Sequence, residues 1–282
     1  MKNIWILARM TFREAIRRRI VLTGLALGLI FLTVFNIGFR LVFVNIPENE
    51  GASQALTNVI NNEGINALAL AGLYAVTFLS AAMGALLGAD TLSGEIISGT
   101  IQTIVTKPVR RSDVVFGKWL GFAILLGLYS LLMSGGTVLS VWIQSGHTLH
   151  NVFAGLALIY LESLLIMTIS LSCSSFLSGL ATGGVVFGLY GLSFIGGWVE
   201  QIGAALQNET AVKVGIVTSL VIPSESLWRR AAFEMQSPLS AALGMSPFGT
   251  ISAPSIVMIG YAVVYLVVVL MAAVSTFKHR DL

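Results

Sequence analysis

Long apolar segments alternate with shorter polar ones along most of this chain. The apolar segments cover about residues 20–39, 67–89, 114–143, 152–176, 180–199 and 255–277. A helix of about 20 apolar residues is long enough to cross the hydrocarbon core of a bilayer. The pattern therefore predicts an all-α integral membrane protein, with six transmembrane helices in a single transmembrane domain that occupies residues 1–282.

The composition agrees with a membrane location. The chain is 56% hydrophobic and only 10% charged, and its mean hydropathy is +0.88. About a quarter of the residues in a typical soluble domain are charged, so a soluble enzyme or binding domain is excluded. The basic residues gather at the ends of the apolar segments, and we therefore expect membrane lipid, and no nucleic acid, as a partner.

Residues 88–121, between the second and third apolar segments, form a charged interruption with a helical pattern. Leu92, Ile96 and Ile101 recur at the spacing of one helix face, and Pro108 ends the pattern. Such spacing is typical of an amphipathic helix at a membrane surface. The segment therefore predicts a short surface helix joined at both ends to membrane spans.

The first 19 residues predict another amphipathic helix. One face carries apolar side chains, those of Trp5, Ala8, Phe12 and Ile16. A cationic row lies beside that face: Lys2, Arg9, Arg13 and Arg17. A helix of this kind lies in the interface with its aromatic side toward the acyl chains. The alternative is a positive flank that only sets the topology.

The Lys and Arg residues indicate the orientation. Of the 16 in the chain, six precede the first span, four lie in residues 88–121 and two follow the last span. Cytoplasmic segments carry the excess of positive charge. We therefore expect a multi-pass protein of the cell's inner membrane, with both termini and the 88–121 loop in the cytoplasm.

Residues 200–254 form the longest segment outside the predicted spans, and they hold four of the six prolines. We expect an outer loop with short helices. Within it, Ser224 resembles the start of a capped helix on which Leu227, Ala231 and Met235 share a face. We expect this helix to rest on the outer surface of the membrane.

Motifs for chemistry within the chain are missing from the sequence. It contains no phosphate-binding G-x-x-x-x-G-K-[ST] loop, so ATP cannot be held by that route. His147 and His150 are spaced so that both could ligate a metal ion, but the surrounding loop supplies no further ligands. Ser193 lacks the glycine that follows a serine nucleophile in hydrolases. We therefore expect no catalytic residue, metal or cofactor in this chain.

The topology and the 88–121 loop together resemble the ABC-2 type permease family. The family pattern is an acid, then Gly-Thr, Pro, Arg and Gly-Lys. The matching residues here are Glu95, Gly99, Thr100, Pro108, Arg111, Gly117 and Lys118. A typical member has a second charged residue beside the acid, whereas Gly94 and Ile96 flank Glu95 here. The long outer region is similar to that of permeases related to the one serving nitrous-oxide reductase maturation.

The resemblance implies the membrane subunit of an exporter that is not itself an enzyme. Two copies of a separate ABC ATPase subunit would bind ATP and Mg, and a second copy of this chain would complete the permease. An external accessory protein is a further candidate partner. The residues implied to contact the ATPase are Glu95, Gly99, Thr100, Ile101, Pro108, Arg111 and Lys118. The interfacial helix would contribute Trp5, Arg9, Phe12, Arg13 and Arg17. The alternative function is an ATPase-independent carrier or a membrane scaffold.

One acidic residue lies inside a predicted span. Glu162 stands about ten residues into the fourth span, near the middle of the membrane. An acid at that depth is costly unless it faces protein or water, so it is a candidate for a substrate path or a relay. The alternative is a structural role in which Tyr160, Ser163 or a neighbouring helix satisfies the carboxyl group.

Overall fold

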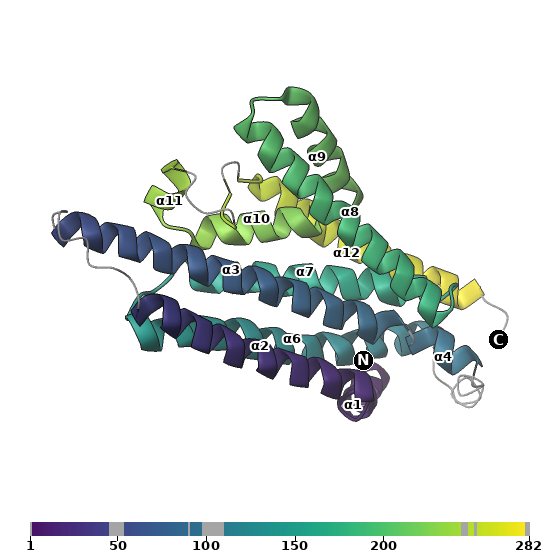
Figure 1. Ribbon diagram of the computed structural model, residues 1–282. Helices are drawn as coiled ribbons and strands as arrows, with labels where there is room; N and C mark the ends of the chain where they lie inside the picture. The colour runs from purple at the N-terminus through teal and green to yellow at the C-terminus, as the bar shows by residue number, and fades with distance from the viewer. Residues whose placement is uncertain are drawn as a thin grey trace.

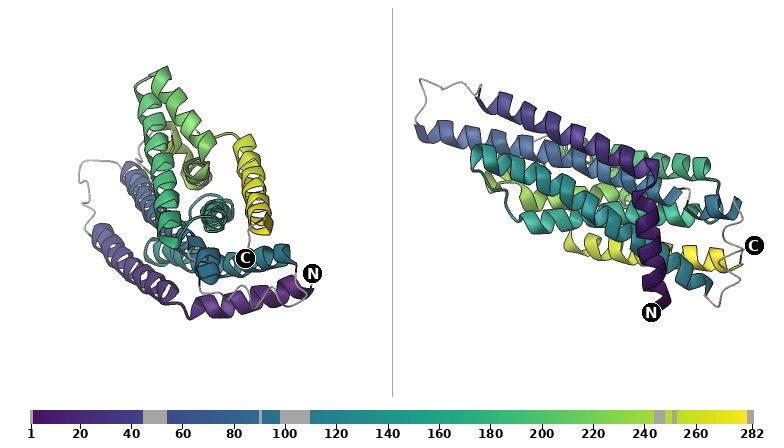
Figure 2. Two further views of the ribbon diagram at one scale, coloured as in Figure 1. Left: turned by 90° about the vertical axis from the view of Figure 1, so that its right-hand side faces the viewer. Right: turned by 90° about the horizontal axis from the view of Figure 1, so that it is seen from below.

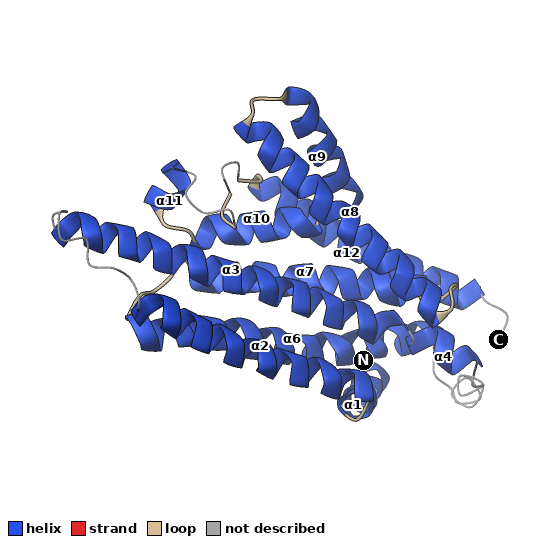
Figure 3. Cartoon of the chain, in the orientation of Figure 1, coloured by secondary structure: helices blue, strands red, loops and turns tan. Residues whose placement is uncertain are grey.

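The computed structural model describes residues 2–44, 54–89, 91–97, 110–243, 248–250 and 253–279. Within these ranges the regular structure is entirely helical (Figure 3). The helices are α1 (Lys2–Ile16), α2 (Arg19–Val44), α3 (Gln54–Ala89), α4 (Thr91–Ile97), α6 (Arg111–Ser145), α7 (Val152–Cys173), α8 (Gly179–Ala205), α9 (Glu209–Val221), α10 (Ser224–Met235), α11 (Pro238–Leu243) and α12 (Ile256–His279).

Six of these helices are long and apolar enough to cross a membrane: α2, α3, α6, α7, α8 and α12. The predicted all-α membrane fold is therefore confirmed. The helices α9 and α10 meet at an angle of 107° and would form a seventh membrane element if the pair counts as one. Figure 1 shows α11 at one end of the bundle, and α4 and the C-terminus at the opposite end.

The third helix begins much earlier than the sequence predicts. α3 starts at Gln54 rather than at about residue 67, in a segment expected to be a loop. Tertiary contacts stabilise this polar extension: the Glu63 carboxylate accepts hydrogen bonds from the Ser237 hydroxyl at 2.6 and 2.7 Å. Asn66 Nδ2 also donates to the carbonyl of Met235, at 3.4 Å. Hydropathy detects the part of a helix inside the bilayer and misses an extension of this kind.

α3 and α7 form the centre of the bundle. A Cβ atom on Gly84 would lie 2.8 Å from the carbonyl oxygen of Ser163, and one on Gly88 would lie 2.6 Å from the Cβ of Ser170. The Ser170 hydroxyl donates to the carbonyl of Ala85 at 2.6 Å. Small residues let helix backbones approach closely where lipid provides no hydrophobic driving force. The two glycines therefore set the distance between the central helices.

The prediction of an outer surface helix at residues 224–235 is wrong in its placement. α10 is a helix as expected, but Leu227, Trp228, Ala231 and Met235 are buried. It packs on α7 and also contacts α3 and α8 (Figure 1). Its charged side chains suggested a surface location, because charged residues are usually exposed. The sequence does not show that such a residue has a buried partner of opposite charge on another helix.

Arg229 of α10 and Glu200 of α8 form that hidden pair. Arg229 Nη2 donates to Glu200 Oε2 at 2.8 Å, and Nη1 lies 2.7 Å from Oε1. The exposed fractions of the two side chains are 2% and 10%. Arginine suits such a two-point contact with a carboxylate. The pair therefore links α10 to the α8–α9 hairpin that rises from the bundle in Figure 1.

Replacing Arg229 with Met will lower the free energy of unfolding by about 3–5 kcal/mol, because Glu200 is left as a buried, unpaired charge. The double variant Arg229→Met/Glu200→Gln will recover most of that loss. Chemical unfolding in detergent micelles measures both. The control is Lys213→Met, which breaks an exposed pair with Glu209 and will change stability by less than about 1 kcal/mol. Equal losses in the single and double variants would contradict the assignment.

Candidate coupling site

Four elements gather at one end of the bundle. They are α1, α4, the first turns of α6 and the last turns of α12, and we call this region the α4 end (Figures 1 and 2). It contains most of the sequence segment predicted to contact an ATPase. Residues 98–109 of that segment lie outside the described residues, so Gly99, Thr100, Ile101 and Pro108 have no structural description.

α4 is anchored in the bundle by its first turn. Leu92 is fully buried in an apolar cluster, which we call the Leu92 cluster. The other members come from α6, α7 and α12: Val114, Val115, Leu171, Leu270, Ala273, Val274 and Phe277. The Leu92 amide also donates to the Ser174 hydroxyl, at 3.4 Å. Leu92 therefore packs with side chains of three membrane helices besides α3.

α1 lies across the long helices and packs closely on α6. The right-hand view of Figure 2 shows α1 crossing the end of the bundle. A Cβ atom on Gly117 would lie 2.5 Å from the Cβ of Leu7, and one on Gly121 would lie 2.7 Å from the carbonyl oxygen of Ala8. The two glycines are four residues apart and therefore lie on the same face of α6. Because they have no side chain, α1 can pack directly against the backbone of α6.

The face that α1 turns toward the protein differs from the predicted apolar face. Ala8, Thr11 and Ala15 are buried against the bundle, whereas Trp5 is 61% exposed. Phe12 is half-buried. Arg9, Arg13 and Arg17 are exposed, and so are apolar side chains of α1 such as Met10. Small residues make the protein contact, so Trp5 and the arginines remain available for another surface. The sequence feature that could have indicated this contact is the pair Gly117 and Gly121 in α6. The apolar periodicity of α1 does not indicate it.

The described coupling residues are placed differently from one another. Arg111 Nη1 donates to the carbonyl of Lys278, at 3.0 Å, and so links the start of α6 to the end of α12. Lys118 is only 6% exposed and lies within the bundle. The backbone of Glu95 belongs to α4. Arg111 and Lys118 thus contact the bundle itself, whereas α1 and α4 lie at its end.

Glu162 lies far from the α4 end, among α3, α7, α8 and α10. It is completely buried, and neither carboxylate oxygen accepts a hydrogen bond from any described residue. The Tyr160 hydroxyl donates to the Ala123 carbonyl at 2.9 Å, and the Ser163 hydroxyl donates to the Tyr160 carbonyl at 2.8 Å. Neither of the proposed structural partners therefore satisfies Glu162.

Two acids that the sequence analysis did not select lie close to this interior region. Glu225 of α10 and Glu200 of α8 are both buried. Their position in an outer, proline-rich segment hid them from hydropathy. In the part of the chain that the structure describes, no three His, Cys, Asp or Glu residues form a group that could hold a metal ion.

Adding one methyl group at Gly121 will unseat α1. In Gly121→Ala the new Cβ meets backbone, so α1 must shift, at a cost of about 1–3 kcal/mol. The readout is maleimide labelling of Ala15→Cys in a Cys173→Ser background, since Ala15 is completely buried. We expect labelling about tenfold faster than in the parent. Gly135→Ala is the matched control on the same helix, because its Cβ meets open space. Equal labelling in both variants would refute the contact.

Comparison with known proteins places these features in a family. The model of the ABC-2 family transporter proteins matches residues 5–282. The chain is 25% identical over 186 residues to the probable ABC transporter permease protein NosY of Stutzerimonas stutzeri, and the match covers 64% of this chain and 60% of the relative. It is 27% identical over 141 residues to the NosY protein of Pseudomonas aeruginosa, covering 50% and 46% of the two chains. The chain thus spans about half the length of these curated relatives. The chain belongs to the ABC-2 family of transporter proteins.

Proposed function

We propose that this permease exports its substrate with energy from a separate ATPase that docks at the α4 end. The observation that carries the proposal is the Leu92 cluster, which fixes α4 to α6, α7 and α12. An ABC ATPase would bind ATP and Mg, and two copies would serve two copies of this chain. The family match favours this function over an ATPase-independent carrier.

Coupling follows from the way α4 is attached. Rotation of a docked ATPase would push on α4 and on the residues that follow it. Because Leu92 is fully buried among side chains of three other helices, a push on α4 would pass into the membrane helices. α1, seated on α6 through Gly117 and Gly121, offers a second contact with the same helix. Its exposed arginines would set the register of docking.

The orientation in the membrane follows from the positive charges. The α4 end contains the basic row of α1 together with Arg110, Arg111, Lys118 and Lys278. These positions favour the cytoplasmic side of the inner membrane. Both termini would then be cytoplasmic, and α11 would lie outside. An external accessory protein would reach the permease from the α11 end.

Placing a charge on the apolar face of the coupling segment will abolish ATPase docking. Ile101→Glu would bury an unpaired carboxylate in the cleft of the ATPase, at a cost of several kcal/mol. Glu95→Ala will weaken docking less, because an exposed charge pair contributes only about 0–1 kcal/mol. The measurement is pull-down of a co-expressed ATPase from detergent extracts, after membrane insertion has been confirmed.

The control for this test is Leu206→Glu. Leu206 follows α8 and is 73% exposed, so the variant introduces the same charge without filling the core. It should recover as much ATPase as the parent chain. If Ile101→Glu recovers as much ATPase as the parent chain, the α4 end is excluded as the coupling surface.

The open face of α8 supports a second copy of this chain as a partner. Four glycines of α8 have open space where a Cβ atom would be: Gly183, Gly184, Gly188 and Gly191. By contrast, Gly196 meets Thr218 of α9 and Gly197 meets Glu225 of α10. Glycines that serve no contact inside the protomer suit close packing against another helix in the membrane. We place the α8 glycines at the contact between two permeases.

Gly188→Leu will weaken the dimer, because a large side chain keeps two closely packed helices apart. We expect at least a tenfold loss of dimer at a fixed detergent concentration, measured by native mass spectrometry with the ATPase co-expressed. Gly260→Leu on α12 is the control, since its Cβ position is equally open. A fully active single copy of the parent chain would exclude the dimer.

A further inference from the structure

A groove runs between three membrane helices on the side of the protein opposite α12. It has a volume of about 720 Å³, and we call it the α2–α3–α8 groove. Its walls are apolar side chains of α2, aromatic and small side chains of α3 and α8, and Phe248. The rings of Tyr74, Phe78, Tyr190 and Phe194 line it.

Two of these rings separate the groove from buried acids. The Tyr74 hydroxyl donates to Glu225 Oε1 at 3.4 Å and accepts from Trp198 Nε1 at 3.3 Å. Tyr190 is in electrostatic contact with both Glu162 and Glu225. Glu225 lies close enough to Glu162 to act on it electrostatically. The apolar wall of the groove is therefore backed by two carboxyl groups within the membrane domain.

The positive charge in this region does not balance the acids. Glu162, Glu200 and Glu225 are all buried, and Arg229 is the basic residue among them. Its guanidinium is held by both oxygens of Glu200. Arg229 also attracts Glu225, so one guanidinium is shared between two acids. Glu162 accepts no hydrogen bond from the described residues. Buried acids without a full partner are stabilised by a cation, either a proton or a positively charged ligand.

We propose that the α2–α3–α8 groove binds hydrophobic organic cations, with the positive charge over the rings of Tyr74 and Tyr190 and the apolar body along α2. The proposal rests on the proposed export function, for which it supplies the class of substrate. Aromatic faces attract cations most strongly where water is excluded, and the acids behind the rings add to that attraction.

The same arrangement discriminates against other ligands. An organic anion would gain no attraction from the two acids and would be repelled by either acid when it is ionised. A neutral acyl chain would fill the groove but would gain nothing from Glu162 and Glu225. A metal ion would find aromatic carbon instead of the oxygen and nitrogen ligands it requires. A cation with a hydrophobic body is the ligand that uses every feature of the site.

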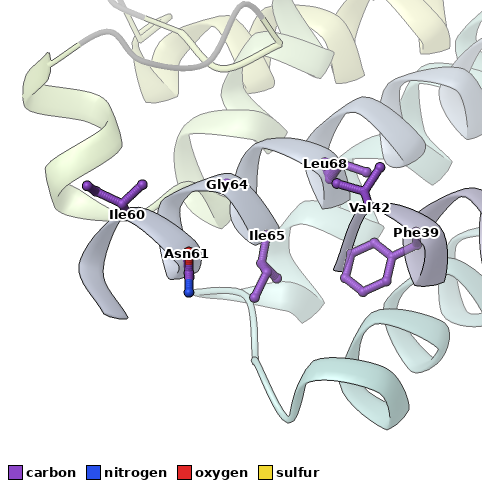
Figure 4. A pocket seen from close by; sticks show the side chains of 7 residues that line it. All are labelled: Phe39, Val42, Ile60, Asn61, Gly64, Ile65 and Leu68. Atoms are coloured by element: carbon purple, nitrogen blue, oxygen red, sulfur yellow. The ribbon is translucent and has the colours of Figure 1, made fainter. Parts of the chain in front are cut away.

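A second apolar pocket lacks these features and serves as an internal comparison. It has a volume of about 190 Å³ and lies between the outer end of α2 and the first turns of α3 (Figure 4). Apolar side chains such as Phe39, Val42 and Ile65 line it, and Asn61 is the polar one among its seven lining residues. None of these seven lining residues is charged, so the pocket wall itself offers a hydrophobic cation no advantage over a neutral molecule.

The test uses two probes of matched size and opposite charge, tetraphenylphosphonium and tetraphenylborate. The full chain is reconstituted in nanodiscs of zwitterionic lipid, and binding to empty nanodiscs is subtracted. We expect the phosphonium to bind at least about tenfold more tightly than the borate, a factor that corresponds to one decade in Kd. Glu162→Gln and Glu225→Gln, which preserve side-chain shape, should each weaken phosphonium binding about tenfold.

Three further variants make the result specific. Tyr74→Phe keeps the ring and should retain most of the binding, whereas Tyr74→Leu should lose it. Glu209→Gln removes an exposed acid outside the groove and should leave binding unchanged. Thermal unfolding midpoints of all variants confirm that the chain is folded in each sample.

Equal binding of both probes would overturn the proposal and leave an apolar groove that suits an acyl chain or a second copy of the permease. Unchanged phosphonium binding in both Gln variants would also overturn it. These outcomes are separate from the fate of the export function, because ATPase pull-down reports on the α4 end alone. Loss of cation binding with intact docking would exclude the substrate class and keep the permease assignment.

Discussion

The close approach of α3 and α7 sets the geometry of the whole bundle. Gly84 and Gly88 leave room for the α7 backbone, and the Ser170 hydroxyl then reaches the Ala85 carbonyl. In lipid the apolar side chains gain little by leaving their surroundings, so contact at this distance replaces the hydrophobic effect as the source of stability. With α7 fixed on α3, the remaining faces of α7 are available to α6, α10 and α12.

This central position of α7 joins two regions that differ in chemistry. At one end, Leu171 belongs to the Leu92 cluster and so contacts the segment that would receive motion from an ATPase. Further along the same helix, Glu162 lies behind the aromatic wall of the α2–α3–α8 groove. A rigid helix that carries both groups connects them physically, and a shift of α4 would change the packing around the acids. The fold thereby offers a direct link between energy input and a candidate binding site.

The buried acids of the interior come from α7, α8 and α10. Arg229 and Glu225 of α10 enter the bundle beside Glu200 of α8, and each buried charge has a cost that its neighbours must offset. The Arg229–Glu200 pair offsets its own cost by two-point contact. Glu162 has no such partner among the described residues. An imbalance of this kind inside a membrane domain marks a place where another positive charge is favoured.

The sequence by itself determined the membrane class, the six spans and the helix at the N-terminus, because apolar length and charge placement are local properties. It also indicated the family through the 88–121 loop and selected Glu162 as unusual. It did not reveal that α10 is buried, that α1 uses its small residues for contact, or that α3 begins before the membrane. Each of these depends on a partner distant in the chain, such as Glu200 for Arg229, Gly121 for Ala8 and Ser237 for Glu63. Only the tertiary structure decided which polar side chains face one another. Such contacts form between different helices, so they do not change the periodicity of residues within any one helix.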